Sequence, residues 1–111
     1  MYIIANAFSV NMLDNDATIS FHRVSLNEVK EKLSNNNFKS IVGHPATAQF
    51  LSELLGVEIP ANREMYKMNK DDVLIVAVLG VRPPEGKVFS KEEVEALYKE
   101  GKVTFWEVRM L

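Results

Sequence analysis

The stretch Val73-Leu-Ile-Val-Ala-Val-Leu-Gly-Val81 is the longest apolar run in the chain, and it decides the fold. The run is about half as long as a membrane-spanning helix needs to be. A strand that is apolar at every position is covered on both faces, as a strand in the middle of a sheet is. We therefore expect residues 72–81 to form a central strand, and we expect no membrane association.

Further strands are predicted on both sides of this run. Residues 2–10 are largely apolar around Asn6, and residues 17–24 alternate in polarity after a turn-forming Asp-Asn-Asp segment. Residues 103–109 alternate in the same way at the end of the chain. Two shorter candidate strands are residues 38–42 and 62–68.

Helices are predicted between these strands. Residues 25–28 and 90–93 both read Ser-x-x-Glu, the capping-box pattern of a helix start. The first helix is expected to end in the asparagine cluster at 35–37, and the second at Gly101.

A third helix is expected to begin at Gly43-His44-Pro45, because proline is favoured at the first helical position, and to end at Gly56. Strands and helices thus interleave along the chain. We predict an α+β fold (α/β-like): one mixed sheet of about five strands with about three helices packed on it.

The composition is that of a globular protein and excludes several functions. The 111 residues suit one domain, residues 1–111, with 47% apolar and 25% charged side chains. The chain has no cysteine and two histidines, and it lacks the spacing of a zinc site. Its net charge of −2 argues against binding to duplex DNA. No targeting segment is visible at the N-terminus, so we expect a cytoplasmic protein.

His44 is the most informative single residue. It follows a predicted strand and lies at a predicted helix start, where free backbone N–H groups and the helix dipole attract phosphate. A histidine beside a phosphate is a natural acid–base catalyst. The alternative is a histidine that only helps to begin the helix, and the residues alone leave both interpretations open.

Three polar residues lie in or just after the first strand: Asn6, Ser9 and Asn11. An asparagine flanked by apolar neighbours needs hydrogen-bond partners. These could be a neighbouring loop of the protein, or the base edges and ribose hydroxyls of a nucleotide, which amides bind well.

Two arginines and a glutamate lie in predicted irregular segments. Arg82 and Glu85 flank two prolines after the central strand, and Arg63 follows Asn62. The planar guanidinium group of arginine binds phosphate with two hydrogen bonds. The simpler interpretation is that these are solvated surface charges.

Read together, these segments resemble one known family, the type III anti-CRISPR ring nucleases, which are small archaeal-virus proteins with bacterial and mobile-element relatives. Five blocks carry the resemblance, in order, from about residue 2 to residue 109. They are Ala5-Asn-Ala-Phe-Ser-Val-Asn-Met-Leu13, Ile41-Val-Gly-His-Pro-Ala-Thr47, Asn62-Arg63, Val81-Arg-Pro-Pro-Glu-Gly-Lys87 and Leu97-Tyr-Lys-Glu-Gly-Lys-Val-Thr-Phe-Trp-Glu107.

The resemblance implies a two-fold homodimer that binds cyclic tetra-adenylate, the second messenger of type III CRISPR defence, and linearises it without metal or other cofactor. The family's catalytic histidine falls on His44, its loop glutamate on Glu85 and its loop arginine on Arg82. The ligand-binding positions of the family fall on Asn6, Ser9, Asn11 and Arg63, together with Arg82.

The residue chemistry suits that reaction. The ribose 2′-hydroxyl can attack the adjacent phosphate in line, and protonated His44 can supply a proton to the leaving 5′-oxygen. Many members of the family have Asp-Ser where this chain has Pro45-Ala46, so a hydroxyl that could contact phosphate is missing here. Two alternatives remain at this point: a non-catalytic module that sequesters a cyclic nucleotide, and a protein-interaction module.

Overall fold

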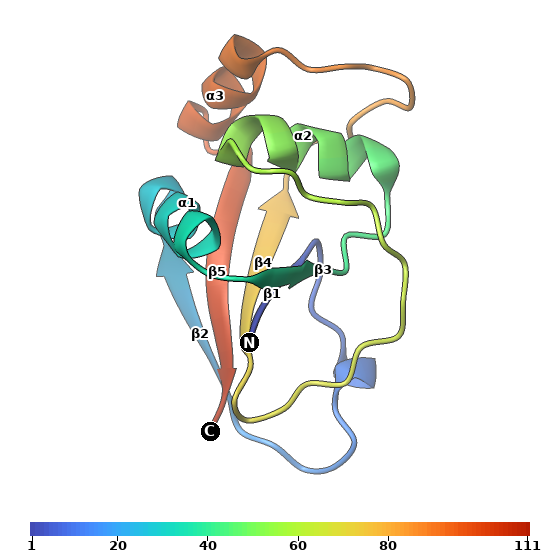
Figure 1. Ribbon diagram of the computed structural model, residues 1–111, viewed down its shortest axis with the longest axis vertical. Coiled ribbons are helices and arrows are strands. Elements are labelled where there is room, and N and C mark those ends of the chain that lie inside the picture. Colours follow the sequence, from blue (N-terminus) through green and yellow to red (C-terminus); the bar gives the residue numbers. More distant parts are fainter.

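The computed structural model describes residues 1–111 and contains one sheet, three α-helices and a short 3-10 helix (Figure 1). In chain order the elements are β1 (Tyr2–Ala5), η1 (Val10–Met12), β2 (Ile19–Val24), α1 (Leu26–Asn35), β3 (Phe38–Ser40), α2 (Pro45–Leu55), β4 (Val73–Leu79), α3 (Lys91–Lys99) and β5 (Val103–Met110).

The five strands form a mixed sheet in the order β2-β5-β4-β1-β3. β1 is parallel to both β3 and β4, whereas β5 is antiparallel to both β4 and β2. The apolar run forms β4, the middle strand, as the sequence predicts. The α+β fold with one five-stranded mixed sheet and three helices is therefore confirmed.

The two faces of the sheet are covered differently. Ile4, Ile75 and Phe105 point to one face and pack with the buried side chains of the three helices. Ile3 and Leu74 point to the other face, which the irregular segments around residues 8–13 and 66–68 cover. Adjacent residues of one strand alternate between the faces, so β4 can be apolar throughout.

The helix boundaries follow from local chemistry. Ser25 and Ser90 each accept a hydrogen bond from the backbone N–H of a glutamate three residues later, and both capping boxes are complete. Gly56 ends α2 with φ 71°, a left-handed conformation in which glycine carries no Cβ penalty. The longest helix has 11 residues, and none could cross a membrane.

Two strand predictions are wrong in extent or in kind. β1 ends at Ala5, and the chain then leaves the sheet, so residues 6–10 are not in a strand. Residues 62–68 form no strand: an isolated parallel bridge joins Val42 to Ala61, the residue just before this segment, and the segment then crosses the sheet face. Met68 is buried there, with its N–H donating to the Met12 carbonyl at 2.8 Å. The apolar side chains of the segment cover the sheet and do not extend it.

Candidate functional site

The topology opens a cleft at the carboxyl ends of the parallel strands. After β1 the chain turns toward the sheet face that carries Phe8 and Met12, and after β3 it turns to the opposite face and begins α2. Adjacent parallel strands whose connections leave toward opposite faces create a crevice at their carboxyl ends. Here the segment that follows β4, residues 80–90, borders the same crevice (Figure 1).

The cleft has a volume of about 620 Å³, within the usual size range of ligand pockets. It brings together four of the sequence-predicted residues, although they are far apart in the chain. Its lining residues are Asn6, His44, Pro45, Ala46, Thr47, Leu79, Gly80, Val81, Arg82, Pro83, Glu85 and Gly86.

His44 occupies the N-cap position of α2, with extended backbone angles (φ −124°, ψ 123°). Its side chain makes no capping hydrogen bond and is exposed to the cleft. Pro45 has no N–H, so the first free amides of the helix are those of Ala46 and Thr47. The imidazole therefore lies at the positive end of a helix dipole, beside unused N–H donors.

Arg82 and Glu85 lie on the segment that connects β4 with α3. At its start, a 2.6 Å hydrogen bond from the Gly80 N–H to the carbonyl of Lys102 joins the segment to the residue just before β5. Glu85 precedes Gly86 (φ 78°) in a tight turn that the Lys87 N–H closes onto the Pro84 carbonyl at 3.3 Å. The turn presents the Glu85 side chain to the cleft.

Lys87, whose N–H closes this turn, has its side chain held by partners within the protein. Its ammonium group lies 3.0 Å from a carboxylate oxygen of Glu93 and 5.1 Å from the centre of the Phe89 ring. Hydrogen bonds from the Ser90 backbone and from Lys87 keep the pKa of Glu93 below its usual value. The cation of Lys87 is thus paired within the protein, whereas Arg82 is not.

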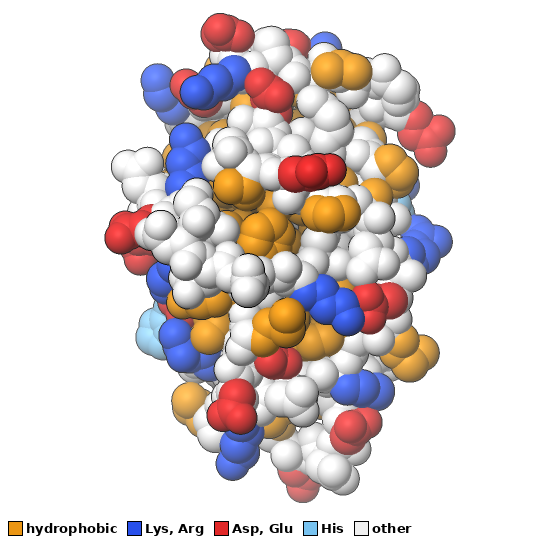
Figure 2. All heavy atoms as spheres, viewed as in Figure 1, with side chains coloured by type: hydrophobic (Ala, Val, Ile, Leu, Met, Phe, Trp, Pro, Cys, Tyr) orange, Lys and Arg blue, Asp and Glu red, His pale blue; other side chains and the backbone are white.

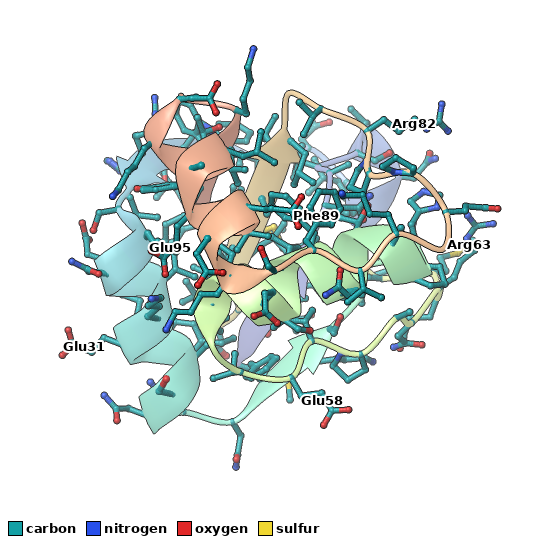
Figure 3. All side chains as sticks on the ribbon, turned by 90° about the horizontal axis from the view of Figure 1, so that it is seen from above. Glu31, Glu58, Arg63, Arg82, Phe89 and Glu95 are labelled. Atoms are coloured by element: carbon teal, nitrogen blue, oxygen red, sulfur yellow. The ribbon has the colours of Figure 1, made fainter.

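Arg63 lies beside the cleft and does not line it. Its side chain crosses Gly43, the residue before His44: a Cβ added to Gly43 would be 3.4 Å from the Arg63 Nε. Figure 3 shows Arg63 and Arg82 extending on the same side of the molecule, with Glu31 on the far side. Neither arginine forms an ion pair within the chain, in contrast to Arg109, which pairs with Glu107.

Ser9 and Asn11 are not brought to the cleft in this chain. Ser9 is the N-cap of the 3-10 helix, where its hydroxyl accepts a hydrogen bond from the Asn11 N–H at 3.2 Å. Asn6, by contrast, lines the cleft, and its side-chain amide makes no hydrogen bond within the chain. Of the three predicted polar residues, one is placed to meet a ligand in the cleft of a single chain.

Thr47 is a cleft residue that the sequence pattern did not reveal. It falls on the buried stripe of α2, with 9% of its surface exposed, yet it lines the cleft and its hydroxyl has no protein partner. Helical spacing alone indicates only that a residue faces the core. Its position in the first turn of a helix after His44 is the signal that could have identified it.

The charges of the protein are mixed, and no metal cluster is present. On the face seen in Figure 2, basic and acidic side chains are interspersed without a broad field of one sign. No group of three or more histidine, aspartate and glutamate side chains is arranged to hold a metal ion. The two unpaired arginines and the amino end of α2 instead favour a small anion.

These features define a small α+β protein with a polar cleft, lined by a histidine, an arginine and a helix start, at the carboxyl ends of parallel strands. The chain belongs to the STIV B116-like family, whose model matches residues 2–104. Its fold matches that of B116 of Sulfolobus turreted icosahedral virus, with a TM-score of 0.86 and 31% identity over 97% of each chain.

Relatives occur in viruses of archaea and in a bacterium. The chain is 36% identical over 98 residues to uncharacterized protein 26 of Sulfolobus islandicus filamentous virus, which covers 87% of this chain and 83% of that protein. It is 36% identical over 75 residues to YddF of Bacillus subtilis, covering 66% and 69%. The resemblance to a family of small archaeal-virus proteins with bacterial relatives is therefore confirmed.

Proposed function

We propose that this protein is a metal-independent ring nuclease that binds and cleaves cyclic tetra-adenylate and so switches off type III CRISPR signalling. One observation carries the proposal: His44, Arg82 and Glu85 line the same cleft although they come from segments about 40 residues apart. The family's sequence blocks support the choice of ligand.

The cleft has the donors that a phosphodiester requires. Ala46 and Thr47, with their free amides at the amino end of α2, and Arg82, with its unpaired guanidinium group, line the same cleft as His44. Donors of this kind stabilise the charge that develops on phosphoryl oxygens in the transition state. Asn6 supplies an amide that can bind a base edge or a ribose hydroxyl.

The reaction needs no metal because the substrate supplies the nucleophile. A ribose 2′-oxygen attacks the adjacent phosphorus and loses its proton to solvent, and the bond from phosphorus to the 5′-oxygen breaks. Protonated His44 gives its proton to that 5′-oxygen, which leaves as a hydroxyl, and a 2′,3′-cyclic phosphate remains. Arg82 and Arg63 stabilise the phosphorane oxygens, and Glu85 orients His44.

A second copy of the chain completes the site in this proposal. Phe8, Phe21, Val78 and Trp106 form an apolar surface that meets the cleft at Asn6. Phe21 is 49% exposed and Val78 45%, which is unusual for a contiguous apolar surface in a monomer. A two-fold partner on this surface would bring two copies of His44 to opposite phosphates of a symmetric ring.

The test is incubation of the purified protein with radiolabelled cyclic tetra-adenylate in the presence of EDTA. We expect linear products from the wild type, and we expect His44→Ala to bind the ring without cleaving it. His22→Ala is the matched control, because His22 is exposed on β2 and lies outside the cleft. Inhibition by EDTA, or normal cleavage by His44→Ala, would overturn the mechanism.

Two other outcomes distinguish the alternative functions. Tight stoichiometric binding by the wild type without turnover would identify a sequestering protein. The groups that bind the phosphates would then be functional, whereas His44 would not act as an acid. Absence of binding to any cyclic oligoadenylate in calorimetry would overturn the proposal and favour a protein-interaction module.

A further inference from the structure

We propose that Lys39 and Asn62 are positioning residues for Arg63: they hold the carboxylate of Glu64 away from the guanidinium group, which stays free for a ligand phosphate. The inference rests on the proposed function for its ligand, and it adds two residues to which no role has been given above.

The segment that carries Arg63 is fixed to the edge of the sheet by its backbone. The Asn62 N–H donates to the Val42 carbonyl at 2.8 Å, next to the bridge between Ala61 and Val42. Just before Ala61, the Pro60 carbonyl accepts a 2.6 Å hydrogen bond from the Ser40 hydroxyl. The backbone of Arg63 is therefore held close to the turn that contains His44.

The side chain of Asn62 makes two further contacts. Its Nδ2 donates to the Ser40 carbonyl at 2.9 Å and to the Oε1 of Glu64 at 2.7 Å. The Oε2 of Glu64 accepts a 2.7 Å hydrogen bond from the Nζ of Lys39, which lies on β3. Both oxygens of the Glu64 carboxylate are thus engaged on the side of β3.

This arrangement leaves the positive charge of Arg63 without a partner in the chain. Glu64 is its neighbour in the chain, yet Arg63 forms no ion pair and lies over Gly43 instead. The hydrogen bonds from Lys39 and Asn62 hold the pKa of Glu64 below its usual value, so the carboxylate remains charged when engaged. If it were released, it would be an anion next to Arg63 and would compete with phosphate for the same fork of donors.

The first experiment measures affinity for cyclic tetra-adenylate with the catalytically inactive His44→Ala protein as the background. We expect Asn62→Ala and Lys39→Met each to weaken binding about three- to tenfold, the usual scale of one ordinary hydrogen bond. In an Arg63→Ala background, neither change should have a further effect, because both act through Arg63. Adding Glu64→Gln to Asn62→Ala should restore most of the lost affinity, because the competing charge is removed.

The matched control is Asn36→Ala. Asn36 also donates one side-chain hydrogen bond to a backbone carbonyl, that of Lys32 at 2.9 Å, but it lies at the end of α1 and not at the cleft. In the same His44→Ala background, we expect its affinity to equal that of His44→Ala alone. The ion pair of Lys39 with Glu64 lies at the surface, so we expect Lys39→Met to fold. This variant still tests the proposal if Asn62→Ala fails to fold.

The second experiment needs no ligand. The ¹⁵N chemical shift of the Arg63 Nε reports the environment of this side chain. We expect the chemical shift to change in Asn62→Ala and to return toward the wild-type value in Asn62→Ala/Glu64→Gln. If the ring does not bind the wild type, the proposed function fails while this result still judges the positioning role. Two results would overturn the inference. One is that Asn62→Ala or Lys39→Met weakens binding further in the Arg63→Ala background. The other is that the Arg63 resonance is unchanged in Asn62→Ala.

Discussion

The side chain of Gln49 pairs with both backbone polar groups of Phe89. Its Nε2 donates to the Phe89 carbonyl at 3.4 Å, and its Oε1 accepts from the Phe89 N–H at 3.2 Å. Below this pair, the rings of Phe50 and Phe89 meet edge to face with centroids 5.0 Å apart. α2 therefore holds both His44, at its first turn, and the end of the segment that carries Arg82 and Glu85.

Replacing Gln49 with alanine should loosen that segment without unfolding the sheet. Two part-buried backbone groups of Phe89 would lose their partners, which costs about 1–3 kcal/mol. We expect faster amide hydrogen exchange at residues 88–90 and unchanged exchange in β4. Gln49→Glu is the control, because it keeps the acceptor and loses the donor, and its exchange should be intermediate. Equal exchange in all three proteins would show that the pair does not hold the segment.

Thr47→Val should weaken ligand binding and leave stability almost unchanged. The substitution keeps the shape of the side chain and removes a hydroxyl that has no partner in the protein but lines the cleft. We expect about a three- to tenfold loss of affinity for cyclic tetra-adenylate by calorimetry. The matched control is Thr18→Val, at an exposed position far from the cleft. A large drop in melting temperature with unaltered affinity would mean that Thr47 serves the core alone.

Phe21→Glu should produce a folded monomer that no longer cleaves the ring. Phe21 is half exposed and meets the ring of Phe8 edge to face, with centroids 5.4 Å apart, on the apolar surface beside the cleft. A charge there opposes burial by a second copy. Analytical ultracentrifugation should show a dimer for the wild type and for Leu111→Glu, which alters another exposed apolar residue. A monomeric wild type that still cleaves would refute the shared site.

Lys32→Met should lower stability near neutral pH by about 1 kcal/mol, and the loss should vanish in acid. Burial acts to raise the pKa of Glu107, but hydrogen bonds from Lys32 and Arg109 outweigh it and lower that pKa. A lowered folded-state pKa stabilises the fold above the unfolded-state value of about 4.3, and this stabilisation is lost as the pH falls through the folded-state pKa.

Thermal melting between neutral pH and strong acid tests this predicted direction of the pH dependence. The difference between the wild type and Lys32→Met should shrink as the pH falls below about 4. Lys70→Met is the control, because Lys70 is exposed and forms no ion pair. A difference that stays constant into strong acid would show that Lys32 acts by packing and not by charge.

His44→Ser should make the protein more stable while abolishing cleavage. The N-cap position of α2 has extended backbone angles and no side-chain cap, and a serine there can accept a hydrogen bond from a free amide of the first turn. We expect a gain of about 1 kcal/mol in melting experiments. His44→Ala should show no gain, and a serine variant no more stable than the alanine variant would contradict the expectation.

Local signals in the sequence predicted most of the fold. The capping boxes at Ser25 and Ser90, the proline after His44 and the apolar run of β4 all act within a few residues, so they could be identified without tertiary contacts. Residues 62–68 were predicted wrongly as a strand, because apolar side chains such as Tyr66 and Met68 look the same in the sequence whether their segment covers a sheet face or extends the sheet.

The site was predictable only in part, for a related reason. His44, Arg82 and Glu85 lie at a helix start and in a loop, where the residues alone also fit purely structural or surface roles, and the family resemblance is what singles them out. Gln49 and Thr47 gave no such signal, since one is an ordinary polar residue of a helix and the other lies on the buried stripe. The engagement of Glu64 by Lys39 joins residues 25 positions apart in the chain, which no local pattern describes.

The uncapped start of α2 has a consequence for the evolution of such proteins. Selection for stability alone would replace the histidine at position 44 with serine, aspartate or asparagine, because each of these caps a helix better. A lineage that no longer needed the cleft would therefore be expected to lose the imidazole early, at no expense to folding. Position 44 is thus a natural indicator, readable from sequence, of whether a descendant of this protein is still under selection for chemistry.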